Sequence, residues 1–169
     1  MNATLIRRFI EATQNVFSTM LATQITFAPP APTSSISCTG DVSSIIGFSG
    51  DVAGAAALRF PLSTALKVVE AFTGEAFDEE SEDFADAIGE LANMICGGAK
   101  SNLDNACVSI SCPQVVIGKD HKIQKPSDAI SISIPCKTPH GDFFIEVSVR
   151  SSAAQSSAVS TAQPRAAAS

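Results

Sequence analysis

The 169-residue sequence contains no tryptophan and no tyrosine, so its own fluorescence is weak. Lysine and arginine together number 11 against 17 acidic residues, giving a net charge of −6, and the basic residues are scattered along the chain. The sequence therefore lacks the basic stripe whose electrostatic attraction drives nucleic-acid binding. We expect no nucleic-acid partner.

Long apolar runs are also absent. Arg7, Arg8 and Glu11 interrupt the N-terminal segment, and no later run reaches the roughly 18 residues of a membrane span. No secretory signal is recognisable. The cysteines are odd in number, follow no disulfide spacing and sit in apolar periodic segments, where a cysteine acts as a small hydrophobe: Cys38, Cys96, Cys107, Cys112 and Cys136. We expect a reduced, cytoplasmic protein with no membrane partner.

No metal or phosphate-binding motif stands out. His121 and His140 lie in predicted loops, and no Cys-x-x-Cys spacing accompanies them. The glycines of "GFSGDVAG" fit neither a dinucleotide fingerprint nor a phosphate loop, and a hairpin explains them better. The sequence therefore predicts no metal site.

The composition changes once, near the C-terminus. With 45% hydrophobic residues, the chain is long enough for one globular domain with a proper core, which we place at residues 1–150. From Ser151 to Ser169 only small and polar residues remain, apart from a single valine. A segment of this composition cannot bury enough apolar surface to offset the loss of conformational entropy on ordering, so residues 151–169 are predicted to be a disordered low-complexity tail.

Helical periodicity marks three segments. Apolar residues recur at three- and four-residue intervals from Asn2, a plausible N-cap, to Leu21. "PLSTALKVVEAFTG" predicts a second helix that ends at Gly74. The third runs from its N-cap candidate Ser81 to about Leu103.

The other segments alternate with the period of a strand. Two runs, 44–49 and 52–60, meet at Gly50-Asp51 as a hairpin. "APPAPTSSIS" is a connection or an edge, because its prolines forbid a helix or a central strand. Further alternating runs start at Val108, Ile130 and Phe143, and "TPHGD" joins the last two in a second hairpin. The predicted fold is α+β and two-layered, with helices packed on a largely antiparallel sheet.

The third helix carries two stripes. Phe84, Ile88, Leu91 and Ile95 form an apolar stripe, and the nearly opposite side carries Asp86, Glu90, Asn93, Gly97 and Lys100. An exposed Glu-x-x-Asn pair is most often two solvated side chains. However, the adjacent Gly97 and Gly98, one turn beyond Asn93, each cost the helix about 1 kcal/mol relative to alanine. Their presence suggests that another surface approaches the helix backbone closely at this point. The alternative is that the helix frays there.

"DAIGELANMICGGAKSNL" resembles the signature of the CheC/CheX/FliY chemotaxis phosphatases, which is Asp or Ser, three residues, Glu, two residues, Asn. Asp86, Glu90 and Asn93 match it position by position. The resemblance extends over almost everything except the C-terminal segment, and the single signature and the chain length favour the CheX type.

The resemblance implies hydrolysis of the aspartyl phosphate on a CheY-type response regulator. Asn93 would position the attacking water, as the glutamine of small GTPases does, because a neutral carboxamide does not repel the phosphoryl group. Glu90 would pair with the regulator's active-site lysine, and Asp86, Gly97 and Lys100 would contact the partner. Any Mg²⁺ would belong to the regulator, so the chain would need no cofactor of its own. CheX proteins are homodimers, and exposed strand edges also favour pairing between chains.

Two other classes of function remain open. The chain would be a binding module for a response regulator or flagellar-switch component if it recognised its partner without hydrolysis. It would be a structural dimer subunit if the Glu90 and Asn93 side chains were merely exposed. A phosphate-release assay and substitution of both residues discriminate these classes.

Overall fold

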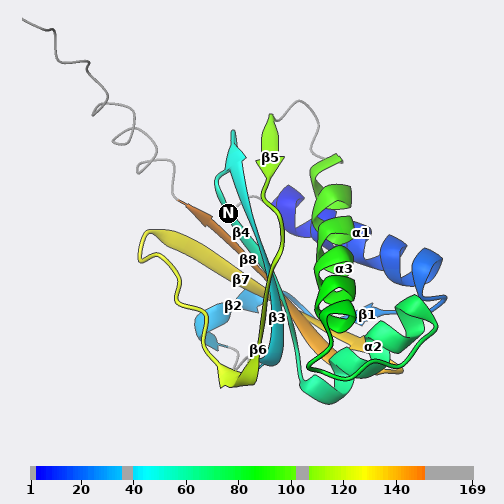
Figure 1. The fold of residues 1–169 in the computed structure, drawn as a ribbon. Coiled ribbons are helices and arrows are strands. Elements are labelled where there is room, and N and C mark those ends of the chain that lie inside the picture. The colour runs from blue at the N-terminus through cyan, green and yellow to red at the C-terminus, as the bar shows by residue number, and fades with distance from the viewer. Residues whose placement is uncertain (1–2, 36–39, 102–106, 151–169) are drawn as a thin grey trace, which may run out of the picture.

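The computed structural model describes residues 3–35, 40–101 and 107–150. In this part of the chain, three α-helices cover one face of an antiparallel sheet (Figure 1). They are α1 (Ala3–Met20), α2 (Leu62–Thr73) and α3 (Glu82–Ser101), and a 3-10 helix, η1, spans Thr33–Ser35. The predicted two-layer α+β fold is confirmed.

The sheet has eight strands in the order β1-β7-β8-β4-β3-β5, with β2 also pairing with β7 and β6 also pairing with β3. Their bounds are β1 (Thr26–Phe27), β2 (Ala31–Pro32), β3 (Gly40–Gly50), β4 (Gly54–Phe60), β5 (Val108–Ile110), β6 (Gln114–His121), β7 (Ala129–Thr138) and β8 (Gly141–Arg150). The proline-rich segment thus supplies one short strand, β2, which pairs with β7 as β1 does just before it, in agreement with its prediction as a connection or an edge.

Both predicted hairpins are present. β3 pairs with β4 from Val42↔Phe60 to Phe48↔Gly54, and β7 pairs with β8 along their whole length. The second turn needs a glycine, because Gly141 has a φ of 132° and a Cβ there would collide with the Thr64 hydroxyl. The long registers place alternate side chains of four strands on the helix-facing side of the sheet.

The core lies between the helices and this side of the sheet. The predicted stripe of α3, Phe84 to Ile95, is buried, as are Phe143, Ile145 and Val147 of β8. The Phe143 ring stacks between Phe17 of α1, at a centroid distance of 5.3 Å, and Phe60 of β4, at 4.7 Å. Each such side chain contributes about 1.5–3 kcal/mol by burial, so these contacts fix α1 on the sheet.

Three expectations need correction. Periodicity did not predict β6, because this edge strand is largely exposed on both sides and its apolar residues Val115, Val116 and Ile117 do not alternate. His121, expected in a loop, is the last residue of β6. Among the cysteines expected to be small buried hydrophobes, Cys96 and Cys136 are buried. Cys107 and Cys112 are exposed and lie outside the strands, Cys107 just before β5 and Cys112 in the connection to β6.

Some expectations lie outside the described residues: Asn2 as an N-cap, Cys38, the helix end near Leu103, and the C-terminal tail after Arg150. Within the described ranges, no helix is both long and apolar enough to cross a membrane.

Candidate functional site

The site lies on α3, and particular residues stabilise both ends of this helix. The Ser81 hydroxyl accepts a hydrogen bond from the Asp83 amide at 3.2 Å, which confirms Ser81 as the N-cap. Glu82 and Asp83 lie in the first turn and Lys100 in the last, where their charges complement the helix dipole. The buried stripe then fixes the rotation of α3, so that its other side faces outward.

The structure places the signature residues on this outward side. Asp86 and Glu90 are exposed and Asn93 is half-buried. Glu90 and Asn93 stand three residues apart, so they are neighbours on the helix surface. Neither side chain has a hydrogen-bond or ion-pair partner among residues 3–35, 40–101 and 107–150. Their polar groups are therefore available to another molecule.

An open groove of about 500 Å³ runs beside Glu90, between α3 and β6. Gly89 explains how closely the two elements approach, since a Cβ there would lie 3.3 Å from Cγ of Pro113 and 3.6 Å from Cγ2 of Val115. A larger side chain at position 89 would push β6 away from the helix. The groove is lined by Ala85, Asp86, Gly89, Glu90, Pro113 and Val115.

The charge of this groove restricts what it accepts. Its titratable side chains are two carboxylates, Asp86 and Glu90, and no described cation lines it. A carboxylate attracts an ammonium or guanidinium group and repels an anion. The groove therefore suits a cationic side chain of a partner, whereas a phosphoryl group fits better beside the neutral Asn93.

The remaining predicted contact residues lie further along α3. No described atom lies within 4 Å of a Cβ placed on Gly97, so the space outside it is open. Gly98 instead faces α1, where a Cβ would lie 3.2 Å from that of Ala12. Lys100 is exposed and borders an apolar gap between α1, α3 and β5 rather than the groove. The structure thus joins Asp86 and Glu90 in one groove and leaves Asn93, Gly97 and Lys100 outside its lining.

Pro113 and Val115 line the groove but were not predicted from the sequence as site residues. Their only local signal was Gly89, a glycine in the middle of a helix, which often marks close approach by another element. The described residues contain no group of three or more His, Cys, Asp and Glu side chains that would hold a metal ion.

The comparisons with known proteins agree with the signature. Residues 42–137 match the family model described as "Chemotaxis phosphatase CheX". The chain is also 30% identical over 155 residues to a protein of Thermotoga maritima named "CheY-P phosphatase CheX", covering 89% of this chain and 99% of that protein. The chain belongs to the CheX family. The matched region of this CheX family member contains α3 and β6, the two elements that form the groove.

Solved structures show the same fold. A CheC-like superfamily protein from Shewanella sp. PV-4 is 30% identical, with a TM-score of 0.81 over 89% of this chain and all of that one. A complex of CheX with CheY, BeF3 and Mg²⁺ from Borrelia burgdorferi contains a chain that is 24% identical, with a TM-score of 0.74 over 87% of this chain and 98% of that one. The CheX fold thus extends over all but a small part of the chain.

Proposed function

We propose that this CheX family member hydrolyses the aspartyl phosphate of a CheY-type response regulator. The observation that carries the proposal is the arrangement on α3: an exposed Glu90 in an acidic groove, with Asn93 next to it and without a partner among the described residues. The relative from Thermotoga maritima is named for this activity, which supports the assignment.

Asn93 is proposed to position the attacking water. A carboxamide both donates and accepts hydrogen bonds, so it can hold one water molecule in a defined orientation without carrying a charge. Phosphoryl transfer demands mainly such positioning and the stabilisation of charge spread over the phosphoryl oxygens. A carboxylate at the same place would repel those oxygens.

Glu90 is proposed to pair with the lysine in the regulator's active site. The acidic groove supports this role, since a lysine entering it would meet Glu90 and the neighbouring Asp86. The ion pair would hold α3 against the regulator with Asn93 directed to the phosphoryl group. Gly97, with open space outside it, and Lys100 are proposed to contact the same partner further along the helix.

The Mg²⁺ in this reaction is proposed to come with the regulator, and the chain itself to require no cofactor. The complex of the same fold from Borrelia burgdorferi contains CheY, BeF3 and Mg²⁺ together with CheX, which supports this division. The four described cysteines are free thiols, which supports a location in the reducing cytoplasm, where response regulators act.

A homodimer is proposed as the working assembly. β6 pairs with β3 on one side, and its other edge pairs with no described strand. Val116 and Ile117 on this strand are 38% and 41% exposed. An exposed apolar edge is a template for pairing with another chain. Sedimentation equilibrium at micromolar concentration tests the proposal, which a monomer near 17.5 kDa would contradict.

The decisive experiment follows the decay of phosphorylated response regulators from the same cell, with and without the chain. Acceleration of decay for at least one regulator is the expected result. Decay at the spontaneous rate for every regulator, together with tight binding to a BeF3-activated one, would instead identify a binding module without hydrolysis.

A further inference from the structure

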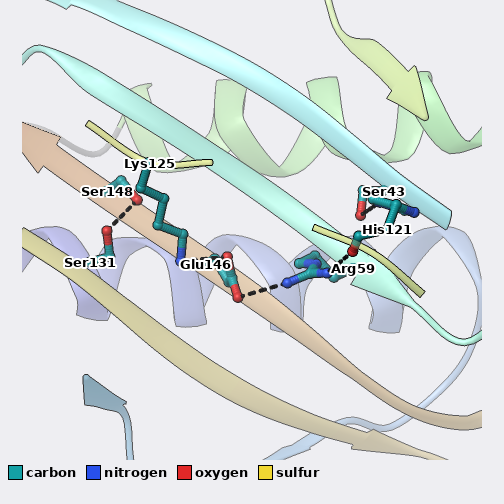
Figure 2. Close-up of polar contacts among 7 residues, drawn as sticks. All are labelled: Ser43, Arg59, His121, Lys125, Ser131, Glu146 and Ser148. Carbon is teal, nitrogen blue, oxygen red and sulfur yellow. Dashed lines mark hydrogen bonds and ion pairs between the residues drawn. The ribbon is translucent and has the colours of Figure 1, made fainter. Parts of the chain in front are cut away.

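The face of the sheet opposite the helices carries a buried ionic cluster. Arg59 of β4 and Glu146 of β8 lie on this face, and their charged groups approach to 3.3 Å between Nη1 and Oε1. Lys125, from the connection between β6 and β7, brings its Nζ within 2.7 Å of the other carboxylate oxygen (Figure 2). The side chains of Arg59 and Glu146 are 6% and 1% exposed, so this arrangement is almost fully removed from water.

The cluster has more positive than negative charge. Glu146 supplies one negative charge, whereas Arg59 and Lys125 supply two positive ones. Arg59 also donates from Nη2 to the His121 carbonyl oxygen at 2.9 Å, a neutral acceptor. One positive charge is therefore not balanced within the cluster. A buried charge without a counter-ion is costly, and a triad of this kind is weak support for stability.

Hydrogen-bond donors are also left over. Nε of Arg59 is buried and has no hydrogen-bond partner among the described residues, and neither has the buried hydroxyl of Thr33. The contact with Glu146 is the one polar contact that the described residues give the Lys125 ammonium, which has three N–H groups. Buried donors are normally satisfied by protein, water or a ligand, so this surplus indicates a missing acceptor.

These groups line a cavity of about 560 Å³ on the same face. The volume lies within the range of small-molecule sites. Arg59, Lys122, Lys125 and Glu146 are the charged residues of its lining, so two positive charges are in excess there although the whole chain carries −6. Ile123 and Ala129 contribute apolar surface to the same lining.

We propose that this cavity binds a small organic anion with two or more acidic groups. Its carboxylate or phosphate groups would lie beside Lys122, Lys125 and Arg59 and balance the excess charge of the lining. Its carbon part would lie on Ile123 and Ala129. A negatively charged group of this kind balances the excess positive charge, which a neutral ligand does not.

Lys122 and Lys125 belong to the segment that directly follows β6. The first residues of the same strand line the Glu90 groove. The anion site lies on the opposite face of the sheet from α3 and contains none of the signature residues. Its occupancy is therefore measurable without any assay of phosphatase activity.

The test is titration calorimetry and thermal unfolding of the full chain with inorganic phosphate, glycerol 3-phosphate, succinate and citrate, at constant ionic strength in KCl. One anion per chain is expected to bind with a Kd of about 1 mM or tighter and to raise the unfolding temperature. Binding by the two phosphates alone identifies a phosphorylated ligand, and binding by the two carboxylates alone identifies a carboxylic acid.

Three lysine variants locate the site. Lys122→Met and Lys125→Met are each expected to weaken anion binding at least tenfold. Lys67→Met, at an exposed position on α2 on the other side of the sheet, is the matched control and is expected to leave the Kd unchanged within twofold. Lys122 is exposed, so its variant keeps the test valid if Lys125→Met does not fold.

Two results would overturn the proposal. One is the absence of any effect of these anions beyond that of KCl. The other is a Lys125→Met protein that unfolds at lower temperature yet responds to the anions as the wild type does, which would leave the cluster with a purely structural role.

Discussion

Gly98 of α3 packs directly against Ala12 of α1, where a Cβ added to the glycine would lie 3.2 Å from the Cβ of the alanine. A Cβ added to the preceding residue, Gly97, would have no described atom within 4 Å. The two adjacent glycines therefore have different structural roles. Gly98 permits close packing of two helices, and Gly97 leaves the outward side of α3 bare near Asn93.

The first prediction follows from this difference. Gly98→Leu is expected to lower the free energy of unfolding by about 1–3 kcal/mol, because the side chain overpacks the α1–α3 contact. Gly97→Ala, in open space, is expected to raise it by about 0.5–1 kcal/mol, because alanine loses less backbone entropy in a helix. Urea unfolding of both variants measures the two changes, and equal effects would contradict the assigned packing.

The second prediction concerns Asn93. If Asn93 only positions water, Asn93→Ala is expected to bind a phosphorylated or BeF3-activated regulator nearly as well as the wild type. Its hydrolysis rate is expected to fall by a factor on the order of 10² or more, as when other positioning donors are removed. Asn15→Ala, at an exposed position on α1, is the matched control. Full hydrolysis by Asn93→Ala would show that another group orients the water.

The third prediction concerns Glu90. Glu90→Ala is expected to cost about 2 kcal/mol or more of binding free energy for the regulator, because it removes an ion pair that becomes desolvated in the complex. Glu90→Lys is expected to be worse, because it meets a lysine. Glu70→Lys on α2 makes the same change of net charge at an exposed position and controls for it. Fluorescence of a regulator tryptophan reports binding cleanly, since this chain has none. Equal affinity of Glu90→Lys and Glu70→Lys would remove Glu90 from the interface.

The fourth prediction concerns the cysteines. Burial raises the pKa of the Cys96 thiol from 9.0 to about 12, and burial likewise raises the pKa of Cys136. At pH 8, iodoacetamide is therefore expected to modify the exposed Cys107 and Cys112 and to spare the buried pair until the protein is unfolded. Mass spectrometry of peptides from a Cys38→Ser background reads the four sites separately. Equal modification of all four in the native protein would contradict the burial.

The same shift makes stability depend on alkaline pH. The unfolded Cys96 thiol loses its proton near pH 9, whereas the folded one keeps it to about pH 12. The unfolded state is thus favoured as pH rises, and this group alone lowers the free energy of unfolding by about 1.4 kcal/mol per pH unit between those values. Cys96→Ala is expected to reduce this slope in urea titrations between pH 9 and 10.5.

The fifth prediction concerns residues 151–169, predicted from their composition to be a disordered tail. Truncation after Arg150 is expected to change the free energy of unfolding by no more than about 0.5 kcal/mol and to leave activity unchanged. Thermal unfolding and the phosphate-release assay provide the measurements. A large loss in either would show that the segment docks on the domain.

The sequence by itself determined the elements whose pattern is local. The 3.6-residue period of α3 separates Phe84 and Ile88 from Glu90, because each helical residue turns by a fixed angle relative to the one before it. The period of two in β7 and β8 assigned their faces in the same way. The candidate pair of Glu90 and Asn93 was therefore visible before the fold, since its geometry depends on one helix alone.

Only the tertiary structure decided which distant segments meet. Val115 of β6 and Pro113, just before that strand, line the Glu90 groove because β6 docks beside Gly89, and this edge strand has no alternating pattern. Arg59, Lys125 and Glu146 come from three segments and form one cluster on the opposite face. The spacing of residues in the sequence does not predict such contacts, because strand pairing and packing bring together surfaces that are far apart in the sequence.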